Sequence, residues 1–258
     1  MVGVFDRYIG IDYSGAQTPD ASLKGLRVYA ASPTSEPVEV PPPPSPRKYW
    51  SRQEVAEWLL EQLNGERRVL VGIDHGFSFP LKYFQKHNLP LDWPLFLEDF
   101  LLFWPTDREY VLSIRQGYRG DYKGRSGNSK WRRLTEVRVG AKSVFHFDVP
   151  GSVATATHAG LPWLLHIREH AKKDVHFWPF DGWEIPPNTS VIAEAYPALC
   201  SHNFPREGRT SDQHDAYSLA AWMRQCDWNG SLIEYFEPNL LPEEREVAEI
   251  EGWILGVR

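Results

Sequence analysis

Two aspartates lie three residues apart inside an apolar segment that otherwise favours a helix. Asp212 and Asp215 occur within 210–222, where Ala216 and Leu219 would face a core. At this spacing both carboxylates project from one face of the helix. Two negative charges so close together repel each other unless a cation lies between them. The pair therefore indicates a cation site.

Three more acids end short apolar runs elsewhere in the chain. Asp12 and Asp74 each follow a run rich in Val, Ile and Leu, and Glu194 lies near the end of a third run, which Pro197 stops. Such runs are typical of strands buried on both faces. Their acids should lie at the carboxyl edge of a central sheet, where open α/β sheets bind ligands.

The order of the apolar patterns predicts an α/β fold. Ser51 and Glu54 form a capping box at the start of one helix, and Gly65 ends that helix. The first elements of the core are therefore a strand, its antiparallel hairpin partner, a helix and a further strand. The elements that we expect are a strand over 8–12, its antiparallel partner over 25–31, the helix after Ser51, strands over 69–74 and 190–197, a helix over 153–171 with a break or kink at 160–162, the helix that carries Asp212, and a surface helix in the tail 242–258.

The segment 76–150 has few clean periods and is too long for a plain loop, so we expect an insertion within a single domain spanning 1–258. The stretch from Arg115 to Lys142 carries a charge of +7, whereas the whole chain carries −6. A basic segment on an acidic body suits an anionic substrate held at one place, although such segments are often only solvated loops. Tyr118 and Tyr122 lie among the basic residues, as in sites that stack bases and neutralise phosphates. The expected substrate-binding residues are Arg115, Arg119, Lys123, Arg125, Lys130, Trp131, Arg132 and Arg133.

Composition narrows the class of protein. A chain of 258 residues with 42% hydrophobic content can bury a sizeable core. It has no run of about 18 apolar residues, and its N-terminus lacks the order of a signal peptide. We therefore expect a cytoplasmic protein with no membrane partner. Cys200 and Cys226 are too few for a disulfide framework and are expected to be small buried hydrophobes.

Taken together, the acidic motifs resemble those of the ribonuclease H-like superfamily. The motifs are Gly-Ile-Asp at 10–12, Gly-Ile-Asp at 72–74 and Asp-x-x-Asp-Ala at 212–216. The last helix is most similar to that of the Holliday-junction resolvases. With Glu-Ala-Tyr-Pro at 194–197, the region from about 8 to 223 resembles the poorly characterised predicted nucleases of this fold. The resemblance implies a mixed central sheet flanked by helices, with a long basic insertion after the fourth strand.

The resemblance also implies a nuclease with two divalent metal ions. Two Mg²⁺ or Mn²⁺ ions about 3.5–4 Å apart activate water and stabilise charge on the attacking and leaving oxygens of a phosphodiester. Such ions prefer carboxylate oxygens. Asp12 is expected to bridge both ions, Asp74 to bind one, and Asp215 to bind the other.

Four further residues have less defined roles at this site. Asp212 and Glu194 are second choices as ligands or as residues that support the ligands. Glu136 joins the site only if the insertion folds over the sheet, and His214 should point away from the two helix acids. Each acid also has a simpler interpretation, because strand-end aspartates often form turns, Asp212 suits the positive end of a helix, and Glu194 could pair with an arginine.

Two other functions stay open. The actin-like branch of ATP-dependent phosphotransferases and ATPases also begins with Gly-Ile-Asp followed by a small-residue turn, here Ser14-Gly15-Ala16. Those folds need a duplicated domain and a second phosphate loop, for which this chain looks too short. The other alternative is a non-catalytic nucleic-acid-binding module on the same fold.

Overall fold

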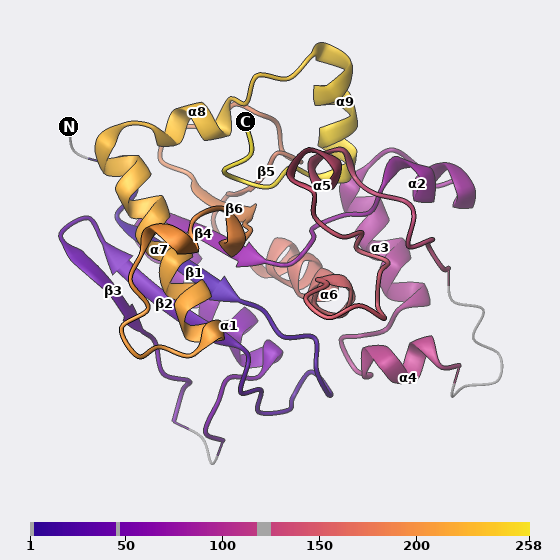
Figure 1. The fold of residues 1–258 in the computed structure, drawn as a ribbon, viewed down its shortest axis with the longest axis horizontal. Helices are drawn as coiled ribbons and strands as arrows, with labels where there is room; N and C mark the ends of the chain where they lie inside the picture. Colours follow the sequence, from indigo (N-terminus) through magenta and orange to yellow (C-terminus); the bar gives the residue numbers. More distant parts are fainter. Residues whose placement is uncertain (1–2, 45–46, 118–124) are drawn as a thin grey trace.

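Six strands form one mixed sheet in the order β3-β2-β1-β4-β6-β5 (Figure 1). The computed structural model describes residues 3–44, 47–117 and 125–258. The first three strands pair antiparallel, whereas β1, β4, β6 and β5 run parallel. The strands are β1 (Arg7–Asp12), β2 (Arg27–Ser32), β3 (Ser35–Glu39), β4 (Val69–Asp74), β5 (Val175–Trp178) and β6 (Ser190–Glu194).

Helices cover both faces of this sheet (Figure 1). Ser51 caps the first helix with Glu54 in the expected capping box. Two short 3₁₀ turns, Pro197–Leu199 and Ser201–Asn203, follow β6. The helices are α1 (Arg52–Leu63), α2 (Leu81–His87), α3 (Trp93–Phe103), α4 (Val111–Arg115), α5 (Leu134–Val139), α6 (Ala154–His170), α7 (Ser211–Asn229), α8 (Leu232–Phe236) and α9 (Pro242–Glu251).

Alternate residues of the central strands face different helices. Ile9 and Val71 belong to the core that includes residues of α1 and α6. Tyr8 and Leu70 face the other side, where α7 and the C-terminal segment pack. Gly10 lies two residues after Tyr8 on β1. A Cβ at this position would lie only 2.2 Å from the carbonyl oxygen of Ala216 in α7. The absence of a side chain at this position therefore lets α7 approach the backbone of β1.

Helix α6 is continuous from Ala154 to His170 and contains Pro162. Of the expected break or kink at 160–162, the break is therefore wrong, and the expected limits of the helix were close. Pro162 has no N–H to donate to the carbonyl oxygen of His158 four residues earlier. That oxygen instead accepts a hydrogen bond from Thr106 Oγ1 at 2.5 Å. A side chain outside the helix thus satisfies the group that the proline leaves without a partner.

The C-terminal segment is more than a surface helix. Residues 253–255 after α9 are buried, and the Leu255 amide donates to the Glu194 carbonyl oxygen at the end of β6, 2.8 Å away. The buried Glu251 carboxylate accepts the amides of Leu81 and Leu134, each at 2.6 Å. These amides begin α2 and α5, so one carboxylate satisfies donors at two helix N-termini. The tail therefore ties the segment after β4 to the edge of the sheet.

Several elements escaped prediction. The described part of 76–150 contains α2 to α5, and neither β3 nor β5 has a clear sequence signal.

Both Cys200 and Cys226 are buried and have free thiols, as expected. Within the described ranges, no helix has both the length and the apolar character needed to cross a membrane.

Replacing Gly10 with Ala should destabilise the protein, because the added methyl group meets backbone atoms of α7 that cannot rotate away. Overpacking of this kind costs about 1–3 kcal/mol, or roughly 2–4 °C of Tm per kcal/mol in a chain of this size. Gly25→Ala is the matched control, since its Cβ would meet its nearest atom at an ordinary 3.6 Å. Thermal unfolding measures both; equal Tm values for the two variants would contradict the close approach of α7.

Candidate functional site

Asp12 and Asp74 end neighbouring parallel strands side by side. They pair in register, as the last residues of β1 and β4. Adjacent strands lie about 4.8 Å apart, so the two side chains leave the sheet edge as immediate neighbours. The two carboxyl groups are close enough that each affects the pKa of the other. The prediction that both acids emerge at the carboxyl edge of a central sheet agrees with this geometry.

Helix α7 supplies the other two acids. Thr210 caps its N-terminus in a capping box with Gln213, which places Asp212 and Asp215 in its first turns. The next residue, Ala216, lies over Gly10, so this end of α7 lies above β1. The Asp212 carboxylate is close to the loop that precedes β2, since a Cβ on Gly25 would lie 3.6 Å from Asp212 Oδ2.

The four acids influence one another electrostatically. Burial raises the pKa of Asp12 well above its ordinary value, and the charges of Asp74, Asp212 and Asp215 raise it further. Burial, Asp215 and Glu194 raise the pKa of Asp74, whereas its contact with Asp12 lowers it. Burial also raises the pKa of Asp215, while the nearby His214 lowers it. Residues from β1, β4 and α7 therefore form one acidic cluster, consisting of Asp12, Asp74, Asp212 and Asp215.

This acidic cluster has no neutralising ion pair within the described part of the chain. Its donors are all carboxylate oxygens, the type that Mg²⁺ and Mn²⁺ prefer. In the described part of the chain, however, no group of three or more His, Cys, Asp or Glu side chains is already arranged to hold a metal ion. The cluster thus fits a hard divalent cation in composition and charge, and binding would require its carboxylates to reorient. Without a cation, protons must neutralise part of its charge near neutral pH.

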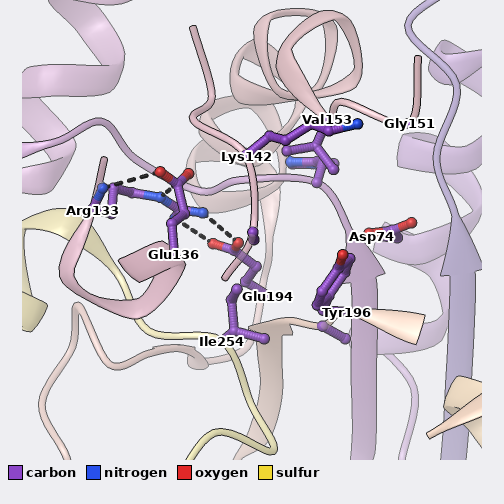
Figure 2. Close-up of a pocket in the computed structure, with 12 residues that line it drawn as sticks. Asp74, Arg133, Glu136, Lys142, Gly151, Val153, Glu194, Tyr196 and Ile254 are labelled. Atoms are coloured by element: carbon purple, nitrogen blue, oxygen red, sulfur yellow. Dashed lines mark hydrogen bonds and ion pairs between the residues drawn. The ribbon is translucent and has the colours of Figure 1, made fainter. Parts of the chain in front are cut away.

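Glu194 has a different environment from the acidic cluster. Its two oxygens accept from Arg133 Nη1 and Nη2, both at 2.6 Å, and one also accepts the Phe77 amide at 3.1 Å. Arg133 Nε donates to Glu136 at 2.9 Å (Figure 2). The Arg133 and Glu136 side chains are 1% exposed and that of Glu194 is 5% exposed. The simpler interpretation of Glu194, an arginine pair, is what the structure shows, and Glu136 belongs to the same buried network.

Arg133 is therefore not placed to meet a substrate, contrary to expectation, because its guanidinium is buried and is held by Glu136, Glu194 and the Glu251 carbonyl oxygen. The other predicted basic residues are dispersed over several partners. Arg115 pairs with the exposed Asp148 at 2.6 Å, and Arg125 pairs with Asp99 at 2.5 Å. Arg132 donates to the Glu136 carbonyl oxygen, Lys130 is exposed, and Trp131 is half-buried. Four further residues lie outside the described residues: Arg119, Lys123, Tyr118 and Tyr122.

Residues not singled out by the sequence patterns hold the loop after Asp12. Arg52 is buried at the start of α1 and donates to the carbonyl oxygens of Ser14, Ala16 and Gln17 at 2.8–3.1 Å. A Cβ on Gly15 would lie 2.2 Å from the Thr155 carbonyl oxygen, so this loop also packs against α6. Only the small-residue turn Ser14-Gly15-Ala16 hinted at such packing.

Two histidines flank the site without joining the acidic cluster as ligands. His75 follows Asp74 and is buried, which lowers its pKa to about 4, and its Nδ1 lies 2.9 Å from the Gly76 carbonyl oxygen. It is therefore neutral at physiological pH. His214 Nε2 lies 3.1 Å from the Ser201 carbonyl oxygen, which connects α7 to the second 3₁₀ turn. This contact gives His214 a structural role beside the acidic cluster.

Comparison of the chain with protein-family models, with curated proteins and with solved structures found no match in any of the three.

The raised pKa values of Asp12 and Asp74 predict a stability that depends on pH. An aspartate in an unfolded chain has a pKa of about 4, so the folded state binds more protons than the unfolded state above this pH. In the absence of metal, stability should be greatest at acidic pH and fall as pH rises through the raised pKa values. Asp12→Asn should flatten this dependence and raise the Tm at pH 8 by a few degrees. Thermal unfolding from pH 5 to 9 in a chelator measures the effect; a wild-type Tm that rises with pH over this range would contradict it.

Removing the charge of Arg133 should be costly. Arg133→Met leaves Glu136 and Glu194 buried without their cation, for which breaking a buried pair costs roughly 3–5 kcal/mol. Arg138→Met removes the more exposed partner of Glu244 and should cost about 1 kcal/mol or less. Urea unfolding compares the two variants. A similar small loss in both would show that the buried network contributes little to the fold.

Proposed function

We propose that this protein is a divalent-metal-dependent nuclease with a ribonuclease H-like fold. The observation that carries the proposal is the acidic cluster, in which carboxylates from β1, β4 and α7 raise one another's pKa at the carboxyl edge of the sheet. Retaining several close carboxylates without an ion pair costs free energy. A site that binds cations in its working state accounts for that cost.

The arrangement of the sheet supports the same assignment. Its mixed character, an aspartate at the end of β1 and a late helix that brings acids over β1 are what the resemblance implies. The close approach at Gly10 gives a physical reason for that placement, because it lets α7 lie directly on the strand that ends at Asp12.

Each acid has a proposed role. Asp12 lies between Asp74 on the neighbouring strand and the acids of α7, which suits it to bridge two ions, with Asp74 and Asp215 as ligands of one ion each. Bound Mg²⁺ or Mn²⁺ ions would activate water and stabilise charge on a phosphodiester. Asp212 adds negative charge beside this site. Glu194, neutralised by Arg133, supports the site by holding the Phe77 amide in the chain that follows Asp74.

A nucleic acid is the proposed substrate. The stretch from Arg115 to Lys142 carries nine basic residues and two acids in an otherwise acidic chain, which favours an anionic polymer. This stretch corresponds to the basic insertion that the resemblance implies after the fourth strand. Lys130, Arg132 and Lys142 are exposed within it, which leaves them accessible to phosphates.

Asp12→Asn and Asp215→Asn test the proposal. Each should reduce Mn²⁺-dependent cleavage of labelled single-stranded, double-stranded and branched DNA and RNA by at least about a hundredfold, because each removes a ligand of the ions that supply the chemistry. Mn²⁺ should also raise the Tm of the wild type and do so less in both variants. Asp174→Asn is the control, since it removes the same charge from an exposed residue just before β5, at the opposite edge of the sheet.

Cleavage by both variants at the wild-type rate would refute the nuclease proposal. Saturable ATP hydrolysis without cleavage of any nucleic acid would instead support the phosphotransferase alternative. Oligonucleotide binding that survives Asp12→Asn, with no turnover in any metal, would support the non-catalytic binding module.

A further inference from the structure

A narrow pocket opens beside Asp74, between the sheet edge and the connection from α5 to α6 (Figure 2). Asp74 and Tyr196 line it from the ends of β4 and β6. Lys142 and Val153 line it from the α5–α6 connection, and Ile254 of the C-terminal segment closes another side. Three parts of the chain that are distant in sequence therefore meet next to the acidic cluster.

Most charged groups in the walls of this pocket already form ion pairs. Arg133 pairs with both Glu136 and Glu194 in the buried network. Asp74 and Lys142 are the charged lining residues, within the described chain, that form no ion pair. The pocket thus presents one carboxyl group and one ammonium group without an ion-pair partner, on different elements, to anything that enters.

The Lys142 ammonium group is held at this place. Gly140 ends α5 in the left-handed conformation, with a φ of 70°, which turns the chain toward the pocket. The Lys142 ammonium donates to the Pro150 carbonyl oxygen, and a Cβ on Gly151 would lie 3.7 Å from its Nζ. An ammonium group has three donors, so the contact with Pro150 leaves two for a ligand. In Figure 2 the Lys142 side chain extends over the pocket toward Gly151.

Tyr196 presents a hydroxyl group from the opposite wall. Tyr196 is half-buried, two residues after Glu194, and its hydroxyl forms no hydrogen bond with the described residues. Burial and the charge of Asp74 raise the pKa of this phenol, which keeps it protonated and able to donate. Figure 2 shows its hydroxyl directed toward the side of the pocket that Asp74 occupies.

We propose that Lys142 and Tyr196 bind a phosphate group of the nucleic-acid substrate beside Asp74. The ammonium neutralises the phosphate, and the phenol donates to one of its non-bridging oxygens. An anion alone would be repelled by Asp74, so the arrangement suits a phosphate that shares a divalent cation with this carboxylate. This inference rests on the proposed nuclease function and identifies the part of the substrate that the site grips.

The chemical group that is bound sets the kind of recognition. Contacts with phosphates position a nucleic acid but carry no direct sequence information. We therefore expect binding through Lys142 and Tyr196 that does not depend on sequence.

Oligonucleotide affinity, measured by fluorescence anisotropy in Ca²⁺ as a function of salt, tests the inference without relying on activity. Lys142→Ala should weaken binding about tenfold. It should also make the slope of log K against log salt shallower by about 0.7 for a single strand or 0.9 for a duplex, the change expected for one lost phosphate contact. Lys142→Arg should restore the slope. Tyr196→Phe should weaken binding by roughly 2–10-fold with an unchanged slope, because it removes one neutral hydrogen bond.

Lys173→Ala is a matched control. Lys173 is also exposed and donates to a backbone carbonyl oxygen, that of Gly65, but it lies just before β5 at the opposite edge of the sheet. It should leave both affinity and slope unchanged. A Lys142→Ala variant that behaves like Lys173→Ala, or a wild type that binds no oligonucleotide, would overturn the inference.

The stabilisation of the protein by Mn²⁺ separates this inference from the nuclease proposal. Lys142→Ala should retain the wild-type increase of Tm in Mn²⁺, because Lys142 is not a metal ligand. If Lys142→Ala leaves the salt slope at its wild-type value while Mn²⁺ still raises the Tm, the phosphate site is refuted and the nuclease proposal is not. The expected slope change together with cleavage that survives Asp12→Asn and Asp215→Asn would refute the nuclease and keep the phosphate site.

Discussion

Mutual repulsion between carboxylates at the carboxyl edge of the sheet is the constraint on which the rest of the structure depends. Parallel pairing puts Asp12 and Asp74 side by side at the ends of β1 and β4. The close approach of α7 to Gly10 adds Asp212 and Asp215. Burial and neighbouring charges then raise the pKa of each residue of the Asp12–Asp74 pair. The fold must hold these groups together by other contacts, and several of the buried polar interactions serve this purpose.

The buried network around Arg133 is one of these. In it, Arg133 pairs with both Glu136 and Glu194 and donates to the Glu251 carbonyl oxygen of the C-terminal segment. The side chain of Glu251 satisfies the first amides of α2 and α5. One acid of the sheet edge, Glu194, is thereby excluded from the acidic cluster and made part of the scaffold. On the other side, Arg52 holds the loop after Asp12 through backbone carbonyl oxygens. The acidic edge is therefore supported from both sides by buried arginines.

Much of the fold was accessible from local patterns. Continuous apolar runs predicted β1, β4 and β6, and the Ser51 capping box predicted α1, because these signals depend only on near neighbours. The strands β3 and β5 were missed because they are short, and β3 is largely exposed with a proline in its middle. The break expected in α6 was wrong because Thr106, distant in the chain, satisfies the carbonyl oxygen that Pro162 leaves without a donor. Helices α2, α4 and α5 were missed because they have seven residues or fewer, too few to show a regular apolar period. Helix α3 was missed although Asp92 caps it and its buried residues Trp93, Phe96, Leu97 and Phe100 follow a helical period.

For the candidate site, the sequence by itself determined the chemistry that is available: hard carboxylate oxygens at strand ends and on one face of a late helix. The strand pattern also indicated that Asp12 and Asp74 would meet at one edge of the sheet, whereas the resemblance implied that the α7 acids approach the same place. Only the tertiary structure decided which acids keep a charge that needs compensation. Glu194 and Arg133 are 61 positions apart, and their pairing depends on how α5 packs over the sheet. Lys142 and Tyr196 likewise approach Asp74 only through the turn after α5 and the end of β6. Charge compensation depends on distances of a few ångströms between remote residues, and local sequence patterns do not encode those distances.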